Sequence, residues 1–417
     1  MSYIFKQRKM DKTQKINERL YFLDWLRIFL IISVFLFHIG MIFNSCDWHI
    51  KNDITYKYKS TLWYIMVYLG KWRMPLLVLI SGAGTFLALG NKTIKSYLKE
   101  RFKRLFIPFI AGIFILVPVQ VYFERIELYD SLISYYPHMF DGIYPIGNFS
   151  WHHLWFIAYL FFISIVVSPF LNYLRSNNFK NTINRLARIV SSKLGANYFL
   201  IPIIISQLIL RPFFPEDTHD FTHDWAAISY YIIYFVSGFI ILSSNQILDS
   251  IIKNRIAYFV ESVFATFVMF TIPYLIESDY LSNFIWSISS YVLAWSCGLS
   301  VLGYTKRYLN KDSNFRNLAN EAIYPFYLLH QPIIVIIGYY VTKINASIFF
   351  KAIIICCTSF VCTIGIYWYF IKPYNVLRLI FGMKPLIKSI TKEKNIKRRS
   401  IFKSNFIQVS YTKRISK

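Results

Sequence analysis

An apolar stretch of 24 residues, from Tyr21 to Asn44, contains three ionisable side chains. Its length suits a helix that crosses a bilayer. The ionisable residues are Asp24, Arg27 and His38, and such groups are costly inside a membrane, where they usually mark a functional site. On a helix, Arg27 and His38 lie within roughly 20° of the same face and about 16 Å apart along the axis. One stripe of this helix therefore holds a cation near one membrane surface and an imidazole near the other.

Structural explanations compete with a functional one for these residues. Asp24 and Arg27 are three positions apart in the first turn, so they can form a self-neutralising pair. A histidine inside a membrane can simply be a hydrogen-bonding group between helices. Because His38 shares its stripe with Arg27, we favour a functional role for it.

The composition excludes an ordinary soluble globule, since 56% of the residues are hydrophobic and the mean hydropathy is +0.42. We predict an all-α, polytopic transmembrane helical bundle of about ten spans with no large soluble domain. The apolar segments that predict these spans are 22–44, 74–90, 105–123, 154–174, 198–213, 226–243, 256–276, 281–304, 322–342 and 346–371.

Basic residues predict the orientation of the chain. If the N-terminus is cytoplasmic, the cytoplasmic segments contain 36 of the 46 Lys and Arg residues, as the positive-inside rule requires. We therefore predict both termini inside, with a cytoplasmic basic N-terminus (1–20), a membrane domain (21–371) and a cytoplasmic basic tail (372–417). About half of the net charge of +25 comes from that tail, so we expect membrane lipids as partners and no nucleic acid.

The second crossing is predicted to begin at Pro75, after an interfacial helix at 62–69 on the outer surface. A full span through 62–69 is the alternative that we favour less. The segment KWRM lies between them, and its charges suggest a boundary. Ser81, Gly82 and Gly84 would let a neighbouring helix approach closely.

A basic segment, NKTIKSYLKERFKRLFIP, precedes the third span. It places Lys99, Arg101, Lys103 and Arg104 within six positions. Positive-inside bias explains part of this charge, and binding of a polyanionic phosphate ligand explains it equally well, because arginine forms bidentate contacts with phosphate. The two explanations are compatible.

Two outer segments are rich in histidine and aromatic residues. The first ends in GNFSWHHLWF, where Trp155 fits either a sugar-stacking floor or an interfacial aromatic belt, and where His152 and His153 lie near the outer depth of His38. The second, RPFFPEDTHDFTHDW, offers His219 and His223 among acids. Since nothing in its spacing enforces a coordination geometry, we predict no metal site.

The ninth span, NEAIYPFYLLHQPIIVIIGYYV, places His330 near the middle of the bilayer. Pro325 and Pro332 flank it, and prolines free backbone groups to bond side chains or a ligand. A hydrogen bond between packed helices is the alternative role for His330.

Five motifs in order, from about residue 21 to 342, resemble the acyltransferase-3 family of integral-membrane acyltransferases. They are YFLDWLRIFLIISVFLFH with its R-x10-H spacing, KWRMPLLVLISG, LKERFKRLFIP, HLWF and IYPFYLLHQP. The resemblance implies a bacterial inner-membrane, multi-pass enzyme. It would transfer an acyl group, succinyl or acetyl, from cytoplasmic acyl-CoA to a hydroxyl of an extracytoplasmic glycan, such as a periplasmic glucan. Acyl-CoA and the glycan would be its partners, and we expect no bound cofactor.

Residue chemistry assigns roles within this scheme. His38 would be the catalytic residue, either as general base or as a covalent acyl carrier, because the ordinary pKa of imidazole is near neutrality. The predicted donor-binding residues are Asp24, Arg27, Arg73, Arg101 and Arg104, with Arg73 steadying the oxyanion or a succinyl carboxylate. The predicted acceptor or supporting residues are His153, Trp155 and His330.

A transporter or flippase is the competing class, in which the same Asp, Arg and His groups form a substrate or proton pathway. Such folds often contain inverted repeats, and this sequence contains no convincing repeat. An inactive scaffold is a third possibility, against which the intact Arg27 and His38 argue. Dependence on acyl-CoA separates the enzyme from the transporter.

Overall fold

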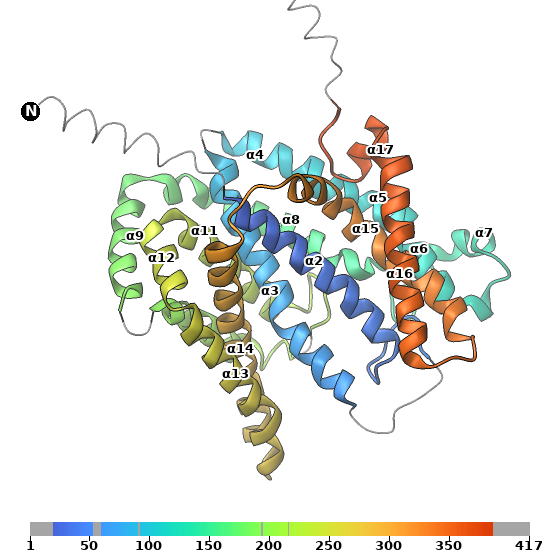
Figure 1. Ribbon diagram of the computed structural model, residues 1–417, viewed down its shortest axis with the longest axis horizontal. Helices are drawn as coiled ribbons and strands as arrows, with labels where there is room; N and C mark the ends of the chain where they lie inside the picture. Colours follow the sequence, from blue (N-terminus) through green and yellow to red (C-terminus); the bar gives the residue numbers. More distant parts are fainter. Residues whose placement is uncertain (1–19, 53–59, 91, 193–194, 216, 387–417) are drawn as a thin grey trace, which may run out of the picture.

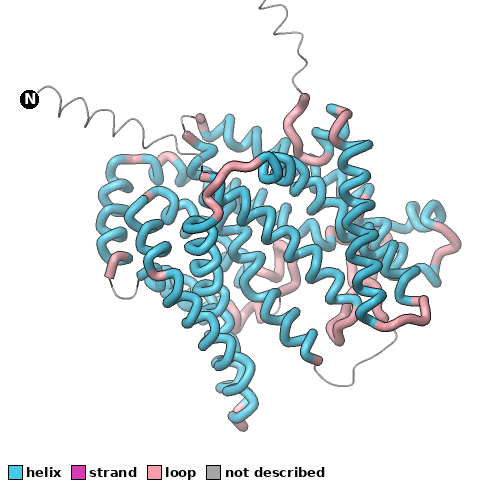
Figure 2. The backbone as a smooth tube through the Cα atoms, in the orientation of Figure 1, coloured by secondary structure: helices cyan, strands magenta, loops and turns pink. Residues whose placement is uncertain are grey.

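The computed structural model describes residues 20–52, 60–90, 92–192, 195–215 and 217–386. These residues form helices and connecting loops, and no β-strand occurs among them (Figures 1 and 2). The predicted all-α helical bundle is confirmed. The predicted regions 1–20 and 372–417 fall mainly outside the described residues.

Nine helical segments in the described part of the chain are long and apolar enough to cross a membrane. Their bounds are Tyr21–Ile42 (α2), Thr61–Leu89 (α3), Ile94–Glu124 (α4, Ile94–Arg101, to α6, Val117–Glu124), His152–Leu171 (with α8, Trp155–Val167), Trp225–Ser243 (α11), Arg255–Leu275 (with α13, Arg255–Thr271), Asp279–Tyr308 (α14), Asn314–Thr342 (α15) and Ile348–Ile371 (with α16, Ile348–Ile366). Shorter helices outside these segments are α7 (Leu132–Tyr135), α9 (Asn177–Val190), α12 (Asn245–Lys253) and α17 (Asn375–Ile380).

The fifth predicted span, 198–213, is a shorter apolar helix, Gly195–Leu210, which includes α10 (Leu200–Leu210). The helix ends just before Arg211 and Pro212. The Arg211 Nε donates to Gln207 Oε1 at 3.0 Å, so its charge lies against the helix end. A polar side chain and a proline together end this helix at Leu210.

The second crossing begins earlier than predicted. Helix α3 runs without interruption from Thr61 to Leu89, so the separate interfacial helix at 62–69 is wrong. Arg73, which suggested a boundary, is only 3% exposed. Its Nε donates to the Leu69 carbonyl at 2.6 Å and its Nη1 to the Ser33 carbonyl of α2 at 3.3 Å. Because these bonds satisfy the buried guanidinium, the helix can continue past Arg73 without a break.

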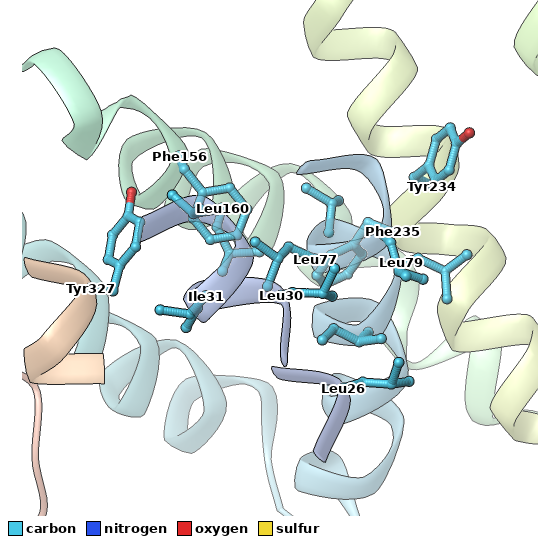
Figure 3. Packing of buried hydrophobic residues seen from close by; sticks show 14 of the residues in the cluster. Leu26, Leu30, Ile31, Leu77, Leu79, Phe156, Leu160, Tyr234, Phe235 and Tyr327 are labelled. Carbon is cyan, nitrogen blue, oxygen red and sulfur yellow. The ribbon is translucent and has the colours of Figure 1, made fainter. Parts of the chain in front are cut away.

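Helix α2 lies at the centre of the bundle and packs against α3, α14, α15 and α16 (Figure 1). Its buried residues include Leu26, Leu30 and Ile31. Figure 3 shows these side chains among others from α3, α8, α11 and α15, such as Leu77, Phe156 and Tyr327. This packing fixes the stripe of α2 that holds Arg27 and His38.

Helices α3 and α11 approach each other closely, and this contact depends on two glycines. A Cβ on Gly82 would lie 1.9 Å from the carbonyl oxygen of Phe235. A Cβ on Gly238 would lie 1.9 Å from the carbonyl oxygen of Leu79. The predicted role of Gly82 in close helix approach is therefore confirmed.

The substitution Gly82→Ala is expected to lower the thermal stability of the detergent-solubilised protein. The added methyl must push α3 and α11 apart, and overpacking of this kind costs about 1–3 kcal/mol. Gly70→Ala is the matched control, because a Cβ on Gly70 of the same helix meets nothing within 4 Å. Equal melting temperatures for the two variants would contradict the contact.

Candidate active site

Three histidines from separate elements form a buried cluster. His38 comes from α2, His330 from α15, and His153 from the short helix His152–Leu154 that precedes α8. The ring centroids of His38 and His330 are 5.2 Å apart, and those of His153 and His330 are 5.7 Å apart. His330 is fully buried and His153 is 5% exposed. The structure thus brings together three residues that the sequence singled out separately.

The prolines of α15 explain how His153 is held. Pro332 has no backbone N–H, so the carbonyl of Leu328, four residues earlier, lacks its helical donor. The Nε2 of His153 donates to that carbonyl at 3.1 Å. The predicted release of backbone groups by these prolines is confirmed at Leu328.

Several buried polar atoms in and around this cluster have no hydrogen-bond partner within the described part of the chain. They are Nδ1 of His38, Nδ1 of His153, Nε2 of His330, Nε2 of His152 and Oε1 of Gln331. Buried polar groups are normally paired, and leaving one unpaired costs about 1–3 kcal/mol. The presence of so many unpaired polar atoms in one place indicates a site that binds a polar ligand.

A second layer of polar side chains borders the cluster. The Nδ1 of His49 donates to Glu124 Oε2 at 2.5 Å, and the Tyr144 hydroxyl donates to Glu124 Oε1 at 3.0 Å. Gln331 Nε2 lies 3.1 Å from His49 Nε2. Burial first, and then the charge of Glu124, raises the pKa of Tyr144 to about 12, so the hydroxyl keeps its proton. Trp48 connects the layers, because its ring stacks on His38 at 5.8 Å.

Among the described residues, one group has ligand atoms close enough together to suggest a metal ion. It consists of His49, Glu124 and His152, whose ligand atoms all lie within 4.8 Å of one another. Two ligands of one zinc ion in tetrahedral geometry lie about 3.3 Å apart. The 2.5 Å separation of Glu124 and His49 is that of a hydrogen bond. The sequence reasoning missed Glu124, although an acid at the end of an apolar span was a usable signal.

A basic cavity of about 570 Å³ opens at the end of the bundle where α2 begins. Arg27, Arg101 and Arg104 line it, so the structure brings three of the predicted donor-binding residues onto one surface. A π-helical turn, Phe102–Phe106, carries Arg104, and such turns are frequent at functional sites. Other lining residues that the sequence reasoning missed are Asn320, Tyr324, Arg378 and Lys384.

One wall of this cavity lies against the histidine cluster. Tyr327 of α15 lines the cavity. Its ring centroid lies 5.7 Å from that of His330 and 5.9 Å from that of His153. The Tyr327 hydroxyl donates to the backbone carbonyl of His153. The cavity and the cluster therefore share a wall.

Asp24 is not among the residues that line this cavity, and its role in donor binding stays a prediction. Its carboxylate pairs with the guanidinium of Arg316, whose side chain is fully buried, and lies 3.6 Å from Arg27. A buried arginine requires a counterion, since an unpaired charge there is strongly destabilising. Asp24 therefore neutralises Arg316, a partner 292 residues away that no local pattern indicated.

Arg73 and Trp155 both contact other protein groups, and their binding roles stay predictions. The guanidinium of Arg73 covers the ring of Phe37 at 3.9 Å, and its bonds go to backbone carbonyls. The ring of Trp155 packs against His219 at 4.3 Å and Tyr231 at 5.7 Å. Trp155 thus belongs to the aromatic packing around α11, and its direct contact with an acceptor stays a prediction.

A second cavity, of about 480 Å³, lies near the opposite ends of α2 and α3. Aromatic residues line it, among them Tyr230, Tyr231, Trp286 and Tyr291. Its charged residues are Lys71, Arg211 and Asp217, with Arg211 and Asp217 paired at 2.6 Å. Phe37, the neighbour of His38, forms part of the wall.

In the acidic loop that contains His219 and His223, two acids accept hydrogen bonds from other groups of the protein. Asp224 accepts the hydroxyl of Tyr159 at 2.7 Å and the backbone N–H of His219 at 3.1 Å. Burial raises the pKa of Asp224 to about 6, in spite of these bonds. Asp220 accepts the backbone N–H of His223 at 2.6 Å. Apart from residue 216, which is not described, the loop brings no three ligand groups together.

Comparisons with known proteins cover almost the whole chain. A family model described as an acyltransferase domain matches residues 20–369. Glucans biosynthesis protein C of Salmonella heidelberg (strain SL476) is 23% identical over 387 residues, and that of Escherichia coli (strain K12) is 24% identical over 399. Each alignment covers 89% of this chain and 96% of the relative. No solved structure matches this chain.

Proposed function

This chain belongs to the acyltransferase-3 family and is an acyltransferase with multiple membrane-spanning helices, and from that premise we propose its reaction. It transfers a succinyl or acetyl group from cytoplasmic acyl-CoA to a hydroxyl of an extracytoplasmic glycan, such as a periplasmic glucan. The enzyme lies in the bacterial inner membrane with both termini in the cytoplasm. The names of the relatives, glucans biosynthesis protein C, support a glucan as acceptor.

The observation that carries this proposal is the shared wall between the basic cavity and the histidine cluster. Arg27, Arg101 and Arg104 suit the phosphates of CoA, because guanidinium groups bind phosphate through paired hydrogen bonds. The acyl-bearing arm would extend from there along α2 towards Tyr327. This path is about 16 Å long between Arg27 and His38, from the rise of a helix.

The reaction takes place at the histidine cluster. His38 lies beside His330 and in stacking contact with Trp48, where it acts on the thioester as a base or as an acyl carrier. Arg73 contributes positive potential from its position over Phe37, since its Nε and Nη1 already bind carbonyls. Exclusion of water by the buried ring cluster would protect the thioester from hydrolysis.

The acceptor enters from the other membrane face. The aromatic cavity at the opposite ends of α2 and α3 offers ring surfaces for sugars, and its charged and hydroxyl groups offer hydrogen bonds. Phe37 connects this cavity to His38. Donor and acceptor thus approach the cluster from opposite ends of the same helix.

Inverted membrane vesicles test the proposal directly. Vesicles with glucan enclosed in the lumen receive labelled acetyl-CoA or labelled succinyl-CoA on the outside, which is the cytoplasmic face. We expect label from one donor to appear in the enclosed carbohydrate, and right-side-out vesicles to show none. Glucan that crosses the membrane without acquiring label from either donor would instead support the transporter.

A further inference from the structure

Two histidines of the cluster are held in one tautomer by backbone carbonyls of α15. The Nδ1 of His330 lies 2.6 Å from the carbonyl oxygen of Tyr327, and the Nε2 of His153 lies 3.1 Å from that of Leu328. A carbonyl oxygen only accepts, so each of these ring nitrogens carries the hydrogen. In a neutral imidazole the other nitrogen is then a lone pair. These lone pairs are Nε2 of His330 and Nδ1 of His153.

Both lone pairs are buried and have no partner among the described residues. The ring of His330 is also fixed in orientation, because it stacks parallel to Phe326 at 6.2 Å and meets the edge of Phe35 at 6.5 Å. A rigid, unprotonated nitrogen that can only accept a hydrogen bond is matched to an O–H group. It cannot donate to a thioester carbonyl or to the oxyanion formed from it.

We propose that His330 is the base for the acceptor, which leaves His38 to act on the acyl donor. This inference rests on the proposed function and divides its chemistry between two histidines. The acceptor oxygen attacks the acyl carbonyl carbon while its proton passes to Nε2 of His330. A carbon–oxygen bond forms, and the carbon–sulfur bond of the thioester breaks with its electron pair going to the CoA sulfur. The imidazolium then returns its proton to that thiolate.

If the acyl group has first moved to His38, CoA has already left as a thiol with the ring proton of His38. The bond that then breaks is carbon–nitrogen, with its electron pair going to the His38 ring, and that ring takes the hydroxyl proton that His330 has accepted. The carbonyl of Tyr327 supports the reaction in either case, because it stays hydrogen-bonded to Nδ1–H and favours the charged ring. His153 binds the acceptor in this scheme, because its lone pair, beside His330, accepts a hydrogen bond from a hydroxyl of the same sugar.

The substitution His330→Ala tests whether His330 is the base for the acceptor hydroxyl. We expect kcat for glycan acylation to fall about 10²- to 10⁴-fold, with KM for acyl-CoA unchanged. Imidazole added at millimolar concentration should raise the rate of this variant at least tenfold, since a small base can occupy the vacated space. His138→Ala, at an exposed outer histidine, is the matched control and should keep the wild-type rate with or without imidazole.

Three outcomes would overturn the proposal while the wild type remains active. They are an undiminished rate in His330→Ala, a folded variant that imidazole does not rescue, or a raised KM for acyl-CoA.

The variant Pro332→Ala is a second test, because its new N–H competes with His153 for the Leu328 carbonyl. It should raise KM for the glycan without changing KM for acyl-CoA. If the wild type itself transfers no label, the proposed function has failed, which is a separate result.

Discussion

The variant His38→Ala is expected to lower kcat for acyl transfer about 10²- to 10⁴-fold, while KM for acyl-CoA stays within about twofold of the wild-type value. The imidazole is removed from the reacting centre, where it lies 5.2 Å from the ring of His330. The arginines that would hold the donor phosphates remain in the separate basic cavity. Initial rates of label transfer in inverted vesicles, measured across a range of donor concentrations, give both constants.

His223→Ala is the matched control for this experiment, because its side chain is 76% exposed in the loop that precedes α11. Melting curves of both variants exclude loss of folding, which matters because the His38 ring also stacks on Trp48. Wild-type kcat in a folded His38→Ala protein would refute the mechanism, although the family assignment would stand. A raised KM with normal kcat would move His38 from catalysis to donor binding.

The double variant Arg101→Ala with Arg104→Ala is expected to raise KM for acyl-CoA about 10- to 100-fold with little change in kcat. A hydrogen bond to a charged group contributes about 1.5–3 kcal/mol, and the exposure of Arg104, at 42%, reduces its share. Arg101 is the stronger contributor by this reasoning, because its Nη2 is already oriented by a 2.6 Å bond to Thr85. Titration of acyl-CoA in the transfer assay measures the effect.

A second double variant separates phosphate binding from membrane topology. Lys99→Ala with Lys103→Ala removes the same charge from the same segment, yet neither lysine lines the basic cavity. If the charge serves only the positive-inside rule, both double variants should behave alike. A raised KM in the arginine variant alone would assign the arginines to the donor.

The helical bundle could be predicted from the sequence because membrane spans are a local property. A run of about 20 apolar residues satisfies its own backbone hydrogen bonds as a helix, wherever its neighbours lie. The same local logic placed Arg27 and His38 on one stripe and predicted the freed carbonyl near Pro332. It was wrong at 62–73, because burial of Arg73 against α2 depends on a neighbour that the local sequence does not contain.

The assembly of the site was decided by tertiary packing. His38, His153 and His330 are each visible as polar residues in apolar surroundings, but their distances depend on how α2, α8 and α15 cross. The pairing of Asp24 with Arg316 across 292 residues, and of His49 with Glu124 across 75, follows from the same packing. The sequence by itself determined that the chain forms long apolar helices and which polar groups they carry, since those are properties of short segments. Only the tertiary structure decided which of those groups meet, because the partner of a buried charge or imidazole is the nearest complementary group in space.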